Sequence, residues 1–176
     1  MPAPTIAAIG LVLVLLDLRP EGRDWVPDSL GYTIAAVGFV RLAGRERMFG
    51  WAGLAAAAAA VLGLVEYVPG LLAGTAATVL VLGYNLMLSA MLALAGVAFA
   101  RCAERAGEHS VARQTWWVAR LAVVTWLALL FGVLLSRVAA RAGDALVSIA
   151  AVGSLVALLW LLVLLSLRRT ATCLTT

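Results

Sequence analysis

Acidic side chains with arginine partners are the groups in this sequence best able to do chemistry. Carboxylates that share one face of a protein can bind a cation or a polar head group, and they can equally cap helices and form ion pairs. Both interpretations stay open for a set that we expect to gather on one side of the molecule. The acids of this set are Asp17, Asp24, Asp28, Glu66 and Asp144, and their candidate ion-pair partners are Arg19, Arg23, Arg137 and Arg141.

A second candidate group lies in the middle of a long apolar stretch. Tyr84 and Asn85 are adjacent, and Ser89 follows Asn85 by four residues, which places both on one helical face. Polar side chains at mid-bilayer need partners inside the protein, either as hydrogen bonds between helices or as the wall of a transport path. A transport path predicts a cavity that touches these three residues and opens toward Glu66 and Asp144.

Enzyme and metal signatures are absent from the sequence. There is no HExxH, GxSxG or Walker motif, and Cys102 and Cys173 have neither CxxC spacing nor a histidine beside them. The single histidine, His109, falls in a charged loop. We therefore expect no catalytic residue, no metal site and no cofactor, although a carboxylate-driven enzyme that uses Glu66 and Asp144 as acids stays open.

The composition identifies a membrane protein. Of the 176 residues, 64% are apolar and 12% are charged, whereas an ordinary soluble domain is about 25% charged. The mean hydropathy of +1.06 excludes a disordered chain. All 13 basic residues are arginine, and in a membrane chain this excess sets orientation, so we expect no nucleic-acid partner.

Apolar stretches bounded by charge, Pro or Gly predict an all-α polytopic helical bundle. A transmembrane helix takes about 20 residues, so six spans use most of the chain and leave one integral membrane domain over 1–176. Pro27 and Asp28 are typical of a helix start, because proline lacks an N–H and the helix dipole favours an anion there. The expected spans are approximately 4–18, 26–42, 49–68, 71–100, 116–138 and 145–167.

Arginine counts orient these six spans. One side of the membrane receives nine arginines and three acids, and the other receives four arginines and six acids. The positive-inside rule therefore predicts that both termini are cytoplasmic. We expect the fourth span to continue as a helix beyond Ala100. The three-residue spacing of Arg101 and Glu104, and of Arg105 and Glu108, places opposite charges side by side, as is usual on a solvated helix face.

The first quarter of the chain resembles a group of uncharacterised small multi-pass bacterial membrane proteins. In that group the first helix ends in Asp-x-Arg, as at Asp17 and Arg19, and the second begins Pro-Asp-x-x-Gly-Tyr or Gly-Trp, as from Pro27 to Tyr32. The resemblance implies a bacterial inner-membrane location and a similar helical bundle, but no activity. Gly31, one turn after Pro27, would let another helix approach closely.

These observations lead to three functional hypotheses. The first is a small transport-related or membrane-accessory protein that acts through the outer acidic groups and the Asn85 region. The second is a structural or assembly subunit of a larger membrane complex, and the third is a lipid-modifying or isoprenoid-cyclising enzyme. The expected partners are the lipid bilayer and either other membrane proteins or further copies of the chain.

Overall fold

The computed structural model describes residues 2–15, 28–64, 74–136 and 139–166, and this part of the chain is all-α with no strand. Each helix coincides with one of the predicted apolar stretches. The six helices are α1 (Ala3–Leu15), α2 (Asp28–Leu42), α3 (Arg47–Leu64), α4 (Gly74–Arg105), α5 (His109–Ser136) and α6 (Ala140–Ser166).

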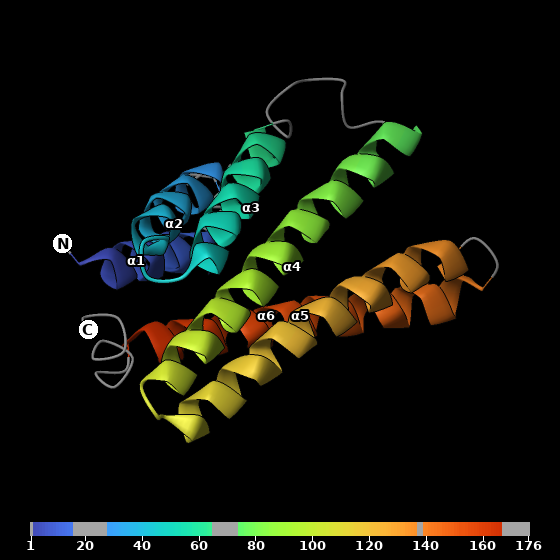
Figure 1. Ribbon diagram of the computed structural model, residues 1–176. Coiled ribbons are helices and arrows are strands. Elements are labelled where there is room, and N and C mark those ends of the chain that lie inside the picture. The colour runs from blue at the N-terminus through green and yellow to red at the C-terminus, as the bar shows by residue number, and fades with distance from the viewer. Residues whose placement is uncertain (1, 16–27, 65–73, 137–138, 167–176) are drawn as a thin grey trace.

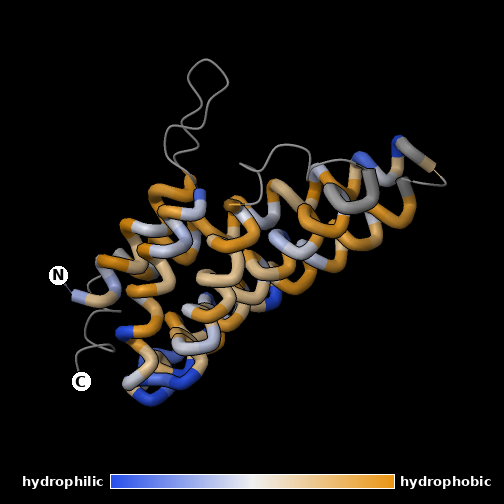
Figure 2. The backbone as a smooth tube through the Cα atoms, turned by 90° about the horizontal axis from the view of Figure 1, so that it is seen from above, coloured by the Kyte–Doolittle hydropathy of each residue, from blue (hydrophilic) through white to orange (hydrophobic). Residues whose placement is uncertain are grey.

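Helices that follow one another in the sequence pack side by side. Figure 1 shows α1, α2 and α3 grouped together, with the long α4 running from this group to an α5–α6 hairpin. α1 also contacts α6, so the first and last helices of the described chain lie against each other. Figure 2 shows apolar residues along the helices and hydrophilic residues concentrated near the turns.

The α1–α2 contact is close enough for the two backbones to touch. A Cβ atom placed on Gly10 would lie 2.3 Å from the backbone nitrogen of Ala35, and one on Gly31 would lie 2.8 Å from the backbone nitrogen of Val14. No side chain fits at either position, so glycine is required there. The predicted close approach of another helix at Gly31 is confirmed.

Alanines and three phenylalanine rings make up a large part of the interior, together with leucine, methionine and tyrosine side chains. Ala52 and Ala56 on α3 are fully buried. Phe49 stacks with Phe39 at 6.3 Å between ring centroids and meets Phe99 edge-on at 4.8 Å. These rings join α2, α3 and α4 near the α2–α3 turn.

Four helices are long and apolar enough to cross a membrane: Arg47–Leu64, Thr78–Arg105, His109–Leu135 and Arg141–Val163. α1 is apolar but has 13 residues, and α2 has 15 residues that include Asp28 and Arg41. Both are shorter than the roughly 17 residues of the shortest transmembrane helices. The chain is therefore a membrane protein with at least four candidate spans, and the count of six stays a prediction.

Candidate functional site

The N-terminal end of α2 carries a polar cluster that reaches across to α4. The Tyr84 hydroxyl oxygen lies 3.2 Å from Asp28 Oδ2 and 3.0 Å from the Tyr32 hydroxyl oxygen. The two tyrosine rings meet edge-to-face, with centroids 5.6 Å apart and an interplanar angle of 87°. We call these three residues the Asp28–Tyr32–Tyr84 cluster.

Local sequence explains how this cluster forms. Asp28 opens α2 and Tyr32 follows by four residues, so both side chains project from the same helical face. α3 passes between the two partner helices at Gly63, where an added Cβ would lie 3.8 Å from both Ser29 and the Tyr84 ring. Ser29 of α2 and Tyr84 of α4 thus approach α3 at the same position, where an added Cβ would make ordinary van der Waals contact with both.

The hydroxyls of this cluster form a short hydrogen-bond chain. A phenol has one proton, so Tyr84 donates to one acceptor at a time. When Tyr84 donates to the Asp28 carboxylate, the Tyr32 hydroxyl can donate to Tyr84 in turn. This arrangement stabilises a carboxylate at a helix N-terminus and joins α2 to α4.

Asn85 and Ser89 do not join Tyr84 in one group. Asn85 Nδ2 donates to the backbone oxygen of Val81, 2.9 Å away on its own helix. Ser89 is buried within the bundle at 6% exposure, while Tyr84 points to α2. The three predicted polar residues of the fourth span therefore have three separate surroundings.

The structure does not bring the other described members of the predicted acidic and arginine group close to Asp28. Asp144 and Arg141 lie exposed at the start of α6, and Figure 1 places this end of the α5–α6 hairpin well away from the start of α2. The others lie outside the described residues, so their grouping stays a prediction; they are Asp17, Asp24, Glu66, Arg19, Arg23 and Arg137.

A second polar cluster joins the α2–α3 turn to the end of α4. Glu46 is only 8% exposed and forms ion pairs with Arg101, at 3.4 Å, and with Arg105. Arg105 Nη1 also donates to the backbone oxygen of Arg45 at 3.1 Å. We call Glu46, Arg101 and Arg105 the Glu46 ion cluster.

The charges that the sequence places side by side at the end of α4 form no ion pairs with one another in the described part of the chain, although Arg101, Glu104 and Arg105 are exposed as on a solvated face. Within the described residues, Arg101 and Arg105 pair with Glu46, while Glu104 accepts a hydrogen bond from Trp116 Nε1 at 3.1 Å. The reason is tertiary, because packing of α3 against α4 brings the buried Glu46 carboxylate within reach of both arginines. The signal available in the sequence was Glu46 itself, a single acid between Arg45 and Arg47 in a helix–helix turn.

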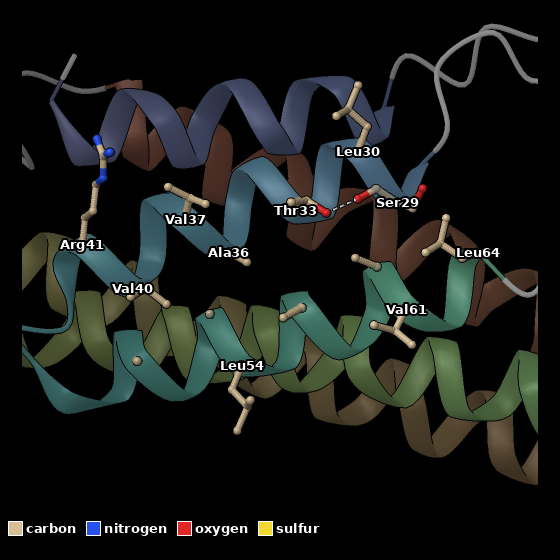
Figure 3. Close-up of a pocket in the computed structure, with 14 residues that line it drawn as sticks. Ser29, Leu30, Thr33, Ala36, Val37, Val40, Arg41, Leu54, Val61 and Leu64 are labelled. Carbon is tan, nitrogen blue, oxygen red and sulfur yellow. Dashed lines mark hydrogen bonds between the residues drawn. The ribbon is translucent and has the colours of Figure 1, made fainter.

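Three surface cavities in the described part of the chain lie elsewhere. A groove of about 1030 Å³ follows α2 and α3 (Figure 3), and a cavity of about 350 Å³ lies at the α4–α5 turn. A third, of about 560 Å³, lies between α5 and α6. Tyr84, Asn85 and Ser89 line none of the three, and none contains two carboxylates.

Metal-ligating side chains do not gather within the described ranges: no three His, Cys, Asp or Glu residues there are placed to hold an ion. Cys102 is a buried thiol on α4. Comparison with protein families, with curated proteins and with solved structures finds no match to this chain.

Proposed function

We propose that this chain is a membrane-accessory protein of the bacterial inner membrane, which acts by assembling with other membrane proteins or with copies of itself. In this proposal all six helices lie in the membrane and both termini are cytoplasmic. The role requires a well-packed bundle with an apolar exterior, and it requires no solute path through the chain.

The observation that carries the proposal is that the Tyr84 hydroxyl contacts α2. A transport path needs polar side chains that face water, whereas the Tyr84 hydroxyl lies against Asp28 and Tyr32. Asn85 is bonded within α4, and Ser89 is buried. These polar groups serve helix structure and packing, which supports an accessory role over a conducting one.

Thiol labelling tests this proposal directly. In a cysteine-free background, Asn85→Cys and Ser89→Cys should resist a water-soluble maleimide in membrane vesicles. Gly44→Cys, in an open turn where an added Cβ meets nothing within 4 Å, is the positive control in permeabilised cells. Rapid labelling at position 85 or 89 would indicate a water-filled path and would contradict the accessory role.

The same method tests the proposed orientation. Cysteines at Gly44 and Ser110 should be protected in intact cells, while Ala142→Cys should be labelled from outside, because the arginine-rich turns are expected in the cytoplasm. Ser110 and Ala142 are both exposed. The reverse pattern would overturn the orientation.

A transport-related role is the second candidate, and the specific observation in its favour is Asp28. Its carboxylate lies within a junction of α2, α3 and α4 and faces two phenols. Such a group can hold a cation or a proton at the outer end of the bundle. The test is cation or proton flux into vesicles that contain the reconstituted protein. Flux by wild type that is lost in Asp28→Asn would favour this candidate.

A further inference from the structure

The groove along α2 and α3 is the largest of the three cavities, and it is almost wholly apolar. Exposed side chains recur along each helix at alternating three- and four-residue spacing and form its two rims. Figure 3 shows the groove following the two helices, with Arg41 near one end and Ser29 and Leu64 near the other. The rim residues are Leu30, Thr33, Val37 and Val40 on α2, and Leu54, Ala57, Val61 and Leu64 on α3.

Charge is confined to one end of this groove, because Arg41 is its one charged lining residue. Arg41 lines the end beside the α2–α3 turn. At the opposite end the Thr33 hydroxyl donates to the backbone oxygen of Ser29 at 2.7 Å, so it is already satisfied within α2. A ligand that fits must therefore be apolar over most of its length and anionic at one end.

Positive charge is in excess around Arg41. Arg41, Arg45 and Arg47 are exposed within seven residues, and the one acid of this turn, Glu46, is bound by two arginines from α4. Within the described ranges, no carboxylate pairs with Arg41. The Arg41 guanidinium at this end of the groove is therefore available to bind an anionic group of a ligand.

An exposed tryptophan indicates at which level of the membrane the Arg41 end of the groove would lie. Trp51, one turn into α3, is 55% exposed. Tryptophan is enriched at the level of lipid head groups, and arginine-rich segments lie at the same level. Arg41 is therefore placed where a lipid phosphate would lie, with the groove extending into the hydrocarbon.

We propose that the α2–α3 groove binds one anionic phospholipid, with an acyl chain along the two helices and the phosphate on Arg41. An amphiphile matches both the apolar length and the cationic end, and basic pockets between membrane helices bind such head groups. The inference requires that α2 and α3 lie in a bilayer, and it is independent of the accessory role.

A lipid fits this groove better than another helix does. Close helix packing in membranes needs small residues that form a notch. Here the position of Gly53 is already filled by α2, since an added Cβ would lie 2.8 Å from the Val40 side chain and 3.1 Å from the Ala36 oxygen. Large branched side chains dominate the rims, and a flexible acyl chain can follow them.

Native mass spectrometry of the purified full chain tests the proposal. The probes are phosphatidylglycerol, which is anionic, and phosphatidylcholine, which is zwitterionic, with identical acyl chains, so that the two lipids differ in the head group alone. Wild type should retain phosphatidylglycerol about fivefold better, the effect of one arginine near a lipid phosphate. Arg41→Gln should remove this preference, and Ala57→Phe, which fills the groove, should lower retention of both lipids.

Two matched variants distinguish a specific site from general attraction. Arg113→Gln removes an exposed arginine of the α4–α5 end, and Val124→Phe enlarges an exposed residue of α5; neither should change lipid retention. Equal retention of the two lipids by wild type, or an unchanged preference in Arg41→Gln, would overturn the proposal. A dimer dissociated by Ala57→Phe with lipid retention unchanged would assign the groove to a second copy instead.

The Arg41→Gln comparison decides the proposal even where Ala57→Phe fails to fold. Arg41 is exposed and its replacement leaves the groove walls in place. Thermal unfolding of each variant establishes that loss of lipid is not loss of fold.

Discussion

The Asp28–Tyr32–Tyr84 cluster and the Glu46 ion cluster join α4 to α2 and to the α2–α3 turn, at two levels of the bundle. Tyr84 and Arg101 are 17 residues apart on one helix, which is roughly 25 Å. The first cluster consists of one carboxylate and two phenols, with Tyr32 1% exposed. The second consists of one enclosed carboxylate and two arginines whose side chains are 44% and 59% exposed.

This difference in exposure determines what each cluster contributes. Hydrogen bonds enclosed by protein lose little to solvent, and a polar group left without its partner there is costly. Ion pairs with exposed arginines are screened by salt, and the arginines can be rehydrated when the partner is removed. The Asp28–Tyr32–Tyr84 cluster should therefore contribute more to stability, and the contribution of the Glu46 ion cluster should decrease as salt is raised.

The largest expected effect comes from Tyr84→Phe. This change removes the hydroxyl that contacts Asp28 and Tyr32 but leaves the carboxylate in place, so we expect a loss of about 1.5–3 kcal/mol in unfolding free energy. Detergent-solubilised protein unfolded by heat or denaturant provides the measurement. Tyr32→Phe, which keeps the Tyr84–Asp28 contact, should lose less, and equal losses would argue against Tyr84 as the central group.

The next largest effect is expected for Glu46→Gln, which should lower the unfolding free energy by about 1–2 kcal/mol at low salt. The expected size is below that of a fully enclosed ion pair because both arginines remain hydrated on one side. Raising salt should shrink the difference between wild type and variant, as measured by melting temperature. Glu108→Gln, at a carboxylate in no ion pair of the described part of the chain, is the matched control. A difference that does not depend on salt would contradict the screening argument.

Asp28→Ala should lower stability by about 1 kcal/mol. The variant loses a favourable charge at the N-terminus of α2, but the Tyr84 hydroxyl can still bond with Tyr32, so no enclosed charge is left behind. The smaller loss, compared with Tyr84→Phe in the same unfolding assay, distinguishes removal of the Asp28 carboxylate from removal of the Tyr84 hydroxyl that contacts it. Unchanged stability combined with lost cation flux would move Asp28 from a structural to a transport role.

The smallest effect is expected for Asn85→Leu, within about 0.5 kcal/mol of wild type. Asn85 donates to a carbonyl of its own helix and joins neither cluster. Interhelical hydrogen bonds in membranes are themselves worth little, and a bond within one helix contributes less to the bundle. A loss above 1 kcal/mol in the unfolding assay would show that Asn85 has a partner role in folding.

Local pattern was sufficient for the helices and for some of their contacts. Each apolar stretch bounded by charge or glycine forms a helix, because backbone groups in an apolar medium must bond within their own segment. α4 continues beyond Ala100 to Arg105, as predicted. The described part of α2 begins at Asp28, and Pro27 lies outside the described residues. Gly31 marks a close helix contact for a reason that lies in the residue itself, which is the absence of a side chain.

Partner choice among polar groups was decided by tertiary structure. The sequence places Arg105 near Glu108 along one helix, yet it binds Glu46, 59 residues away. Likewise Tyr84 was predicted beside Asn85 and Ser89, yet it meets Asp28 and Tyr32 on α2. Adjacent helical positions point in different directions, so a neighbour in the sequence is often on another face.

What the sequence by itself determined is the class of protein, the positions of its helices and the polar residues that need partners. These follow from composition and from local backbone chemistry, which each segment carries with it. Only the tertiary structure decided that Tyr84 serves α2, that Glu46 gathers two arginines and that an apolar groove with a cationic end lies along α2 and α3. The physical reason is that such contacts depend on how helices far apart in the sequence rotate and pack against one another, which no single helix specifies.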